Sequence, residues 1–230
     1  MLPLVMIPAL GCDAGLYEPV AEGLRPLARP RTLVVAEPTL EACVSRVLSE
    51  VEGAFIIAGT SFGGYVALET ALAAPDRVRG LWIMGSSAGA TRDPAGARTR
   101  GIALRDGRFE SVVTGLADAI AHLPGPRGEA TRNTFLAMAR QMGPEPMARQ
   151  NEALAARQDR WGDLPRIACP VLLLWGREDQ FTPASDGLRM AGLLPDARYA
   201  EIRGCGHLPT LEAPEEVVGI ATHWLRERVG

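Results

Sequence analysis

Short apolar runs and stretches of helical spacing alternate along the first 85 residues. The apolar runs predict strands over residues 2–7, 32–36, 55–58 and 78–84, and the helical spacing predicts helices over residues 17–27, 40–51 and 62–74. Strands that alternate with helices in this way form a parallel sheet covered by helices on both faces. The pattern therefore predicts an α/β fold with a mostly parallel, doubly wound sheet.

The alternation stops between residues 86 and 165, where only helical patterns occur. These patterns predict helices over residues 95–104, 109–122, 129–142 and 146–157. Further strands are predicted over residues 170–175 and 197–202, with helices over residues 184–193 and 214–228. We therefore predict a core built from residues 1–85 and 166–230, with residues 86–165 inserted as a helical cap, or lid.

The sequence Gly-Thr-Ser-Phe-Gly at residues 59–63 lies where a predicted strand meets a predicted helix. A serine in this pattern and context fits a nucleophile elbow, a sharp turn that exposes the hydroxyl at the edge of the sheet. A side chain at Gly59 or Gly63 would collide with the neighbouring strand or helix. Ser61 is the predicted nucleophile; the alternative is a glycine-rich turn whose serine has no catalytic role.

A serine nucleophile needs a histidine to accept its proton and a carboxylate to orient that histidine. His207 is the favoured base because it lies in a glycine-rich loop directly after the last predicted strand. His122 and His223 fall in predicted helices and are interpreted as packing or surface residues.

The carboxylate is expected after the strand that precedes this loop, where Gly-Arg-Glu-Asp at residues 176–179 offers two candidates. Asp179 is favoured over Glu178 because its shorter side chain suits the fixed turn between Gly176 and Pro183. The alternative is that Asp179 only caps the helix that begins near Thr182.

The order serine, aspartate, histidine, with the segments Gly-Thr-Ser-Phe-Gly-Gly, Gly-Arg-Glu-Asp and Gly-Cys-Gly-His-Leu-Pro, resembles the α/β-hydrolase superfamily. Within it, the chain looks like small capped bacterial serine carboxylesterases, enol-lactone hydrolases and acyl-carrier methyl-ester esterases. The resemblance implies a catalytic triad of Ser61, Asp179 and His207. Members usually begin with a two-strand hairpin that has no counterpart before residue 2, so we expect about six strands instead of eight.

The family's His-Gly-x-Gly oxyanion loop is replaced here by Pro-Ala-Leu-Gly at residues 8–11. The donor in such a loop is a backbone N–H. The resemblance therefore still implies an oxyanion hole formed by the N–H groups of Leu10 and Phe62.

Together these features predict a cofactor-free serine hydrolase that cleaves a small-molecule ester or lactone through an acyl-enzyme intermediate on Ser61. Carbon–carbon bond hydrolysis, perhydrolysis and acyl transfer on the same triad stay open. So does a small-molecule-binding scaffold without turnover, because the fold alone does not choose among them.

Composition narrows the classes of partner. All 24 basic residues are arginine, which excludes a Schiff-base lysine, and a net charge of −3 without a basic run gives nucleic acid little to bind. No apolar run approaches the roughly 20 residues that span a bilayer, and the start lacks a signal peptide's features, so we expect no membrane partner and a cytoplasmic location. The four isolated cysteines predict free thiols and no metal site. The oligomeric state is left open.

The predicted cap contains apolar side chains that could line an adaptable substrate pocket, namely Phe135, Met138, Met142, Met147 and Trp161. The alternative is that they form the cap's own core. Residues 86–165 carry 11 arginines and 9 acidic residues, whereas the rest of the chain carries 13 arginines and 18 acidic residues. This slight positive excess favours a carboxylate-bearing substrate.

Cys12 and Cys205 flank the two loops that are expected to meet above the nucleophile. One hypothesis is that at least one of these thiols borders the site, where alkylation would slow hydrolysis. The favoured alternative is that both are small buried residues.

Overall fold

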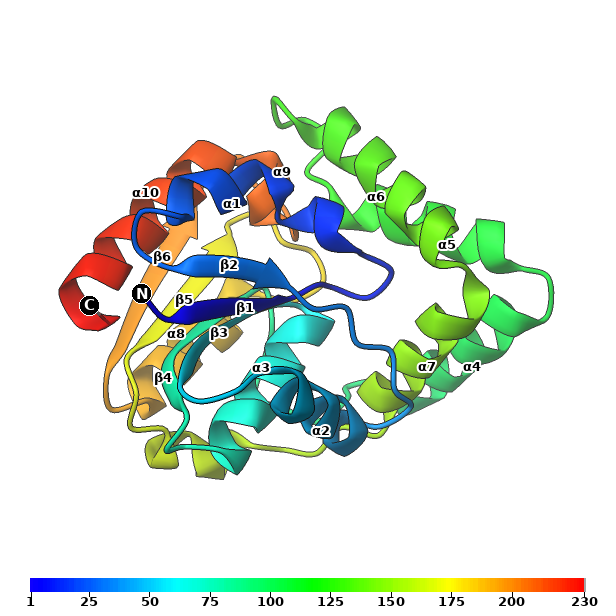
Figure 1. Cartoon of the computed structure of the whole chain (residues 1–230). Coiled ribbons are helices and arrows are strands. Elements are labelled where there is room, and N and C mark those ends of the chain that lie inside the picture. Colours follow the sequence, from blue (N-terminus) through cyan, green and yellow to red (C-terminus); the bar gives the residue numbers. More distant parts are fainter. Residues whose placement is uncertain (230) are drawn as a thin grey trace.

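The structure, a computed structural model that describes residues 1–229, contains a six-stranded sheet in which every pair of neighbours is parallel (Figure 1). The strands are β1 (Pro3–Ile7), β2 (Arg29–Thr32), β3 (Phe55–Thr60), β4 (Val78–Met84), β5 (Val171–Gly176) and β6 (Ala197–Ile202). Their spatial order is β2-β1-β3-β4-β5-β6. The order reverses direction between β1 and β3, and ligands bind at such a switch point in open α/β sheets. The predicted fold class is confirmed.

Helices cover both faces of the sheet (Figure 1). One face carries α1 (Glu18–Leu24), α9 (Pro209–Glu212) and α10 (Pro214–Trp224), and the other carries α2 (Leu40–Glu50), α3 (Phe62–Ala73) and α8 (Ala184–Leu193). Every residue of β3 and β5 is buried as a result. Burial on both sides explains why these strands are continuous apolar runs instead of alternating ones.

Four helices follow one another between β4 and β5. They are α4 (Pro94–Arg105), α5 (Phe109–Ile120), α6 (Gly128–Met142) and α7 (Pro144–Ala155), and a short 3-10 helix, η2 (Trp161–Arg166), follows them. Figure 1 shows α4–α7 on the side toward which β1 and β2 point. Asp93 caps the start of α4 by accepting a hydrogen bond from Gly96 N at 2.8 Å, and Gly143, with φ +78°, separates α6 from α7.

The prediction of the second strand was wrong. The strand occupies Arg29–Thr32, whereas residues 33–36 lie beyond it. Leu33 N still donates to Met6 O, but the chain then turns toward α7, where Val35 O accepts a hydrogen bond from Gln150 Nε2 at 2.8 Å. The apolar side chains of Leu33 and Val35 are therefore buried without belonging to the sheet. A short helix before α1, η1 (Ala14–Leu16), and the helices η2 and α9 were also not anticipated.

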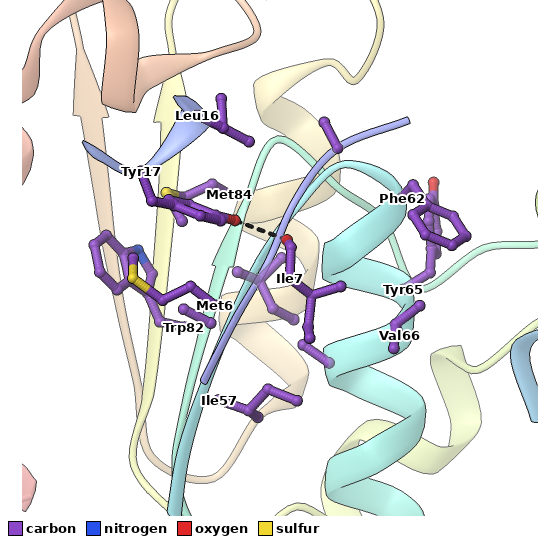
Figure 2. Close-up of a cluster of buried hydrophobic side chains, with 14 of the residues drawn as sticks. Met6, Ile7, Leu16, Tyr17, Ile57, Phe62, Tyr65, Val66, Trp82 and Met84 are labelled. Atoms are coloured by element: carbon purple, nitrogen blue, oxygen red, sulfur yellow. Dashed lines mark hydrogen bonds between the residues drawn. The ribbon is translucent and has the colours of Figure 1, made fainter. Parts of the chain in front are cut away.

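Tyr17, just after η1, contacts the ends of two central strands, and Figure 2 shows the hydrogen bond to the first of them, at Ile7. Its hydroxyl donates to Ile7 O at 2.7 Å, at the end of β1, and lies 2.9 Å from Thr60 Oγ1, at the end of β3. The ring is fully buried beside Trp82 and Met84. A buried phenol needs such partners, and here they fix the two strand ends from which the Pro8 loop and Ser61 begin.

Candidate active site

Ser61 occupies a strained turn between β3 and α3. Its backbone has φ +52° and ψ −113°, and among residues 1–229 it is the one non-glycine residue with positive φ. A Cβ at Gly59 would lie 2.0 Å from Gly63 O, and a Cβ at Gly63 would lie 1.9 Å from Ile7 O. The turn therefore requires glycine at both positions. Such strain costs on the order of 1–3 kcal/mol and is typical of functional residues.

His207 and Asp179 form a buried pair. His207 Nδ1 lies 2.7 Å from Asp179 Oδ2, and their side chains are 3% and 1% exposed. The other carboxylate oxygen, Oδ1, accepts hydrogen bonds from Phe181 N at 2.8 Å and Thr182 N at 3.0 Å. One oxygen thus fixes the local turn while the other faces the imidazole. An arrangement of this kind holds the ring with a proton on Nδ1 and leaves Nε2 free to accept one.

Glu178, the rival carboxylate, has a different contact. Its Oε2 accepts a hydrogen bond from Cys205 N at 3.0 Å, and its own backbone N–H donates to Cys205 O. Glu178 therefore anchors the loop that carries His207 and does not contact the imidazole.

Ser61 and His207 line one cavity of about 320 Å³. Within residues 1–229, Ser61 Oγ has no hydrogen-bond partner, so the two side chains share the cavity without a direct bond. Unliganded sites often have loose catalytic contacts that tighten when substrate binds. The cavity reaches from the sheet edge into the inserted helices, whose contributions include Leu116 and Ile120 of α5 and Leu154 of α7.

Two backbone N–H groups remain free beside Ser61. Phe62 N is the first amide of α3, Leu10 N lies in the loop after β1, and neither has an acceptor in the described part of the chain. The next amide of that loop, Gly11 N, donates to Gln150 Oε1 of α7 at 3.0 Å. Gln150 thus braces the loop from the inserted helices. Sequence reasoning missed it, because a glutamine on a helix is usually exposed.

Glu212 is a second residue that sequence reasoning missed. Its buried carboxylate accepts hydrogen bonds from Gly206 N at 2.9 Å, Leu208 N at 3.2 Å and His122 N at 2.9 Å. The first two donors flank His207, and burial raises the pKa of the Glu212 carboxyl. A lone acidic residue within the apolar segment Leu-Pro-Thr-Leu-Glu-Ala-Pro was the available signal.

The structure places the five predicted pocket residues elsewhere, and this expectation is corrected. Phe135, Met138 and Met147 are buried in the hydrophobic core, Met142 and Trp161 are partly buried against it, and none of them lines the cavity. A Cβ at Gly11 would lie 2.8 Å from Met147 Cε and 3.5 Å from Phe135 Cε2. Met147 and Phe135 therefore support the loop at residues 8–11, and the alternative that the five residues pack in a core is the correct one.

Cys12 and Cys205 are both fully buried, and neither lines the cavity. Burial raises the pKa of both thiols, so they are poor nucleophiles. The hypothesis that one of them borders the site was wrong, and the favoured alternative of small buried residues is confirmed. All four cysteines are free, as predicted.

No helix among residues 1–229 combines the length and apolar character needed to cross a membrane. In the same residues, no three His, Cys, Asp or Glu side chains gather in a way that could hold a metal ion.

A family model described as the alpha/beta hydrolase family matches residues 4–220, so the chain belongs to this family and is a hydrolase of the α/β fold. The chain is similar to a pimeloyl-[acyl-carrier protein] methyl ester esterase of Aromatoleum aromaticum. The two are 33% identical over 196 residues, which cover 78% of this chain and 77% of that protein.

The chain is also similar to a 2-hydroxy-6-oxononadienedioate/2-hydroxy-6-oxononatrienedioate hydrolase of Dechloromonas aromatica, with 30% identity over 162 residues. That match covers 66% of this chain and 55% of the relative. Among solved structures, a thermophilic esterase from Thermogutta terrifontis superimposes with a TM-score of 0.90 at 24% identity. It covers all of this chain and 91% of its own length, which shows a shared fold.

Proposed function

We propose that the protein is a serine hydrolase that cleaves a carboxylic ester or lactone of a small molecule through an acyl-enzyme intermediate on Ser61. One observation carries the proposal. The buried hydrogen bond between Asp179 and His207 adjoins a cavity that is also lined by a serine on a strained elbow. The arrangement supplies a nucleophile, a base and an orienting carboxylate in the roles that acyl transfer requires.

In the proposed mechanism, Ser61 Oγ attacks the substrate carbonyl carbon while His207 Nε2 takes the hydroxyl proton. Asp179 Oδ2 accepts the hydrogen bond from Nδ1–H and stabilises the imidazolium that forms. The N–H groups of Leu10 and Phe62 donate to the carbonyl oxygen as it becomes negative.

The C–O bond to the leaving group then breaks, and the imidazolium returns its proton to the leaving oxygen. A water molecule, deprotonated by His207, attacks the acyl-serine and releases the carboxylic acid, and the proton returns to Ser61. No redox partner is needed, since every step moves only protons and electron pairs.

We assign residues 86–165 the role of a cap that encloses the substrate. Much of the cavity wall comes from this segment, including Thr91, Leu116, Ile120 and Leu154. A cavity of about 320 Å³ favours a small acyl group. The similarity to an esterase supports ester cleavage over the other reactions that this triad could perform.

Carbon–carbon bond hydrolysis is the second candidate, because one relative is named as a 2-hydroxy-6-oxononadienedioate hydrolase. The two are separated by comparing turnover of that compound with turnover of p-nitrophenyl esters. A protein that consumes the dienedioate but no ester performs the second reaction.

The deciding experiment is hydrolysis of short p-nitrophenyl esters and small lactones by purified wild type and Ser61→Ala. We expect the substitution to lower kcat by about four orders of magnitude or more without changing the thermal midpoint. Ser111→Ala, exposed on α5, is the control and should retain full activity. Near-normal activity in folded Ser61→Ala would remove Ser61 from the mechanism. A wild type that turns over none of these substrates would contradict the assigned reaction.

A further inference from the structure

Charged side chains gather in one part of the cavity wall, mostly on the inserted segment between β4 and β5. Asp93, Gly96, Ala97 and Arg100 line the cavity and recur at spacings of three and four, so they lie on one face at the start of α4. Arg92, Arg157 and Asp186 also line it. The wall thus contains three arginines and two aspartates.

Arg92 already has a carboxylate partner. Its guanidinium donates to both carboxylate oxygens of Asp186, at 2.8 and 2.7 Å. The charges of Arg92 and Asp186 cancel, so this pair does not attract an anion. The positive excess of the wall therefore comes from Arg100 and Arg157.

Arg157 is held in place but not neutralised. Its Nε donates to Gly89 O at 3.1 Å, and its guanidinium carbon lies 4.3 Å from the centre of the Tyr65 ring. Tyr65 lies one helical turn after Ser61 on α3, so the ring links this guanidinium to the nucleophile's own helix. Within residues 1–229, Arg157 forms no ion pair.

Arg100 has the most unused donors. Its Nε donates to Asn151 Oδ1 at 2.7 Å, and Asn151 is itself fixed by donating to Ala97 O at 2.7 Å. In the described part of the chain, the two terminal nitrogens of Arg100 have no acceptor, and no carboxylate forms an ion pair with it. The guanidinium fork is therefore oriented by one bond while four N–H groups stay available.

The surroundings make these free donors unusual. Arg100 and Arg157 are only partly exposed, and burial lowers the pKa of both guanidinium groups. Of the 24 arginines, most pair with an acidic side chain among residues 1–229, whereas these two line the cavity without one. A partly buried charge without a partner of opposite sign lowers the stability of the fold, and a bound anion would neutralise it.

We propose that Arg100, assisted by Arg157, binds a carboxylate of the substrate, so that the preferred ester or lactone carries a second, free carboxylate on its acyl part. This inference rests on the proposed function, because it assumes that the reacting carbonyl lies at Ser61 in the same cavity. A carboxylate matches the planar fork in a bidentate manner.

The charge balance favours a monoanion over a phosphate. Asp93 remains close to Arg100 while its Oδ1 caps α4, so the two free arginines and this aspartate leave about one unit of positive charge. A carboxylate cancels that charge, whereas a doubly charged phosphate would exceed it and meet Asp93.

The test compares mono-p-nitrophenyl esters of unbranched dicarboxylic acids of four to seven carbons with neutral p-nitrophenyl alkanoates of matched length. For the best chain length, we expect wild type to show a higher kcat/KM on the acid-bearing ester. Arg100→Gln should lower kcat/KM on that ester by about ten- to a hundredfold, as expected for lost bonds to a charged group, and change the neutral ester by less than about twofold. Arg100→Lys, which keeps the charge but loses the fork, should fall between.

Arg98→Gln is the matched control, since Arg98 is exposed on the same helix and faces away from this cavity. Arg157→Gln provides a second, independent variant should Arg100→Gln fail to fold. Equal kcat/KM for acid-bearing and neutral esters in wild type would overturn the proposal. So would an unchanged preference in a folded Arg100→Gln protein.

Binding of adipate, measured by calorimetry, tests the anion site independently of ester hydrolysis. Should wild type hydrolyse no ester, the proposed function fails, and adipate binding that is lost in Arg100→Gln still supports the anion site. Absence of adipate binding to wild type in that case would overturn the anion site as well.

Discussion

Replacing Asp179 by asparagine tests the proposed roles of the buried pair most directly, because the local backbone dictates how the new amide must sit. Asp179 Oδ1 accepts from two backbone N–H groups, those of Phe181 and Thr182. Only the oxygen of an asparagine can take that position, so its NH₂ group must face His207 Nδ1. An imidazole that accepts there carries its proton on Nε2 and cannot deprotonate Ser61.

The magnitude follows from the cost of the reversed amide. Turning the oxygen toward His207 would point NH₂ at the two backbone donors, at exposed Phe181 and buried Thr182, and each N–H that then faces another donor costs about 1–3 kcal/mol. A total of about 2–6 kcal/mol leaves the productive orientation populated at roughly 3% down to about 0.004%. Asp179→Asn should therefore lower kcat by about thirtyfold to about 25,000-fold, and loss of the carboxylate's charge pushes the result toward the upper limit.

The assay is steady-state hydrolysis of a p-nitrophenyl ester, with circular dichroism and a thermal scan to show that the variant folds. Glu178→Gln is the matched control. Its partner is a single backbone N–H, that of Cys205, so its kcat should fall far less. A folded Asp179→Asn enzyme with more than a tenth of wild-type kcat would refute the reasoning. A larger loss in Glu178→Gln would reverse the assignment of the acid.

Two further predictions concern groups around the site. Burial raises the pKa of the Glu212 carboxyl above its ordinary value of 4.5. The folded state therefore binds this proton more tightly than the unfolded state does. As a result, the contribution of Glu212 to the free energy of unfolding declines as pH rises above 4.5. In urea titrations at pH values above 4.5, the difference in unfolding free energy between wild type and Glu212→Gln should shrink as pH rises. Glu216→Gln, at an exposed position of α10, is the control for the substitution itself. A difference that grows with pH would contradict the shift. Gly63→Ala should cost about 4 kcal/mol or more, or give no folded protein, because its Cβ would overlap Ile7 O at 1.9 Å. Gly219→Ala, with no atom near the new Cβ, should leave the thermal midpoint unchanged or slightly raised, and a stable Gly63→Ala protein would show that the elbow tolerates a side chain.

Three predicted elements have the bounds that the structure shows. Strand β4 at Val78–Met84, strand β6 at Ala197–Ile202 and helix α8 at Ala184–Leu193 agree with the predicted bounds. Strand β2 was misplaced because it is an edge strand of sequence Arg-Pro-Arg-Thr with no buried residue, so it has no apolar signal. The apolar residues 33–36 that follow it gave a false one.

The pocket could not be predicted for a related reason. An apolar stripe shows that a helix face is buried, but it does not show which neighbour buries it. Met147 and Phe135 pack on the loop at Gly11, while the cavity wall is partly built from arginines. A charged residue in a sequence is usually interpreted as a surface residue. Only the tertiary structure shows that, among residues 1–229, Arg100 and Arg157 line the cavity and donate to Asn151 and Gly89 without an acidic partner.

The inserted helices are joined to the loops that carry the proposed chemistry by directional polar bonds, not only by apolar contact. His207 N donates to Ile120 O of α5, the Glu212 carboxylate joins His122 N to the His207 loop, and Gln150 of α7 joins Gly11 N to Val35 O. Removing residues 86–165 would leave several of these buried groups without partners, at about 1–3 kcal/mol each. The segment that supplies Arg100 and Arg157 therefore also holds the His207 loop and the loop at residues 8–11 in position, so changes in this segment should affect the proposed catalysis together with the proposed specificity.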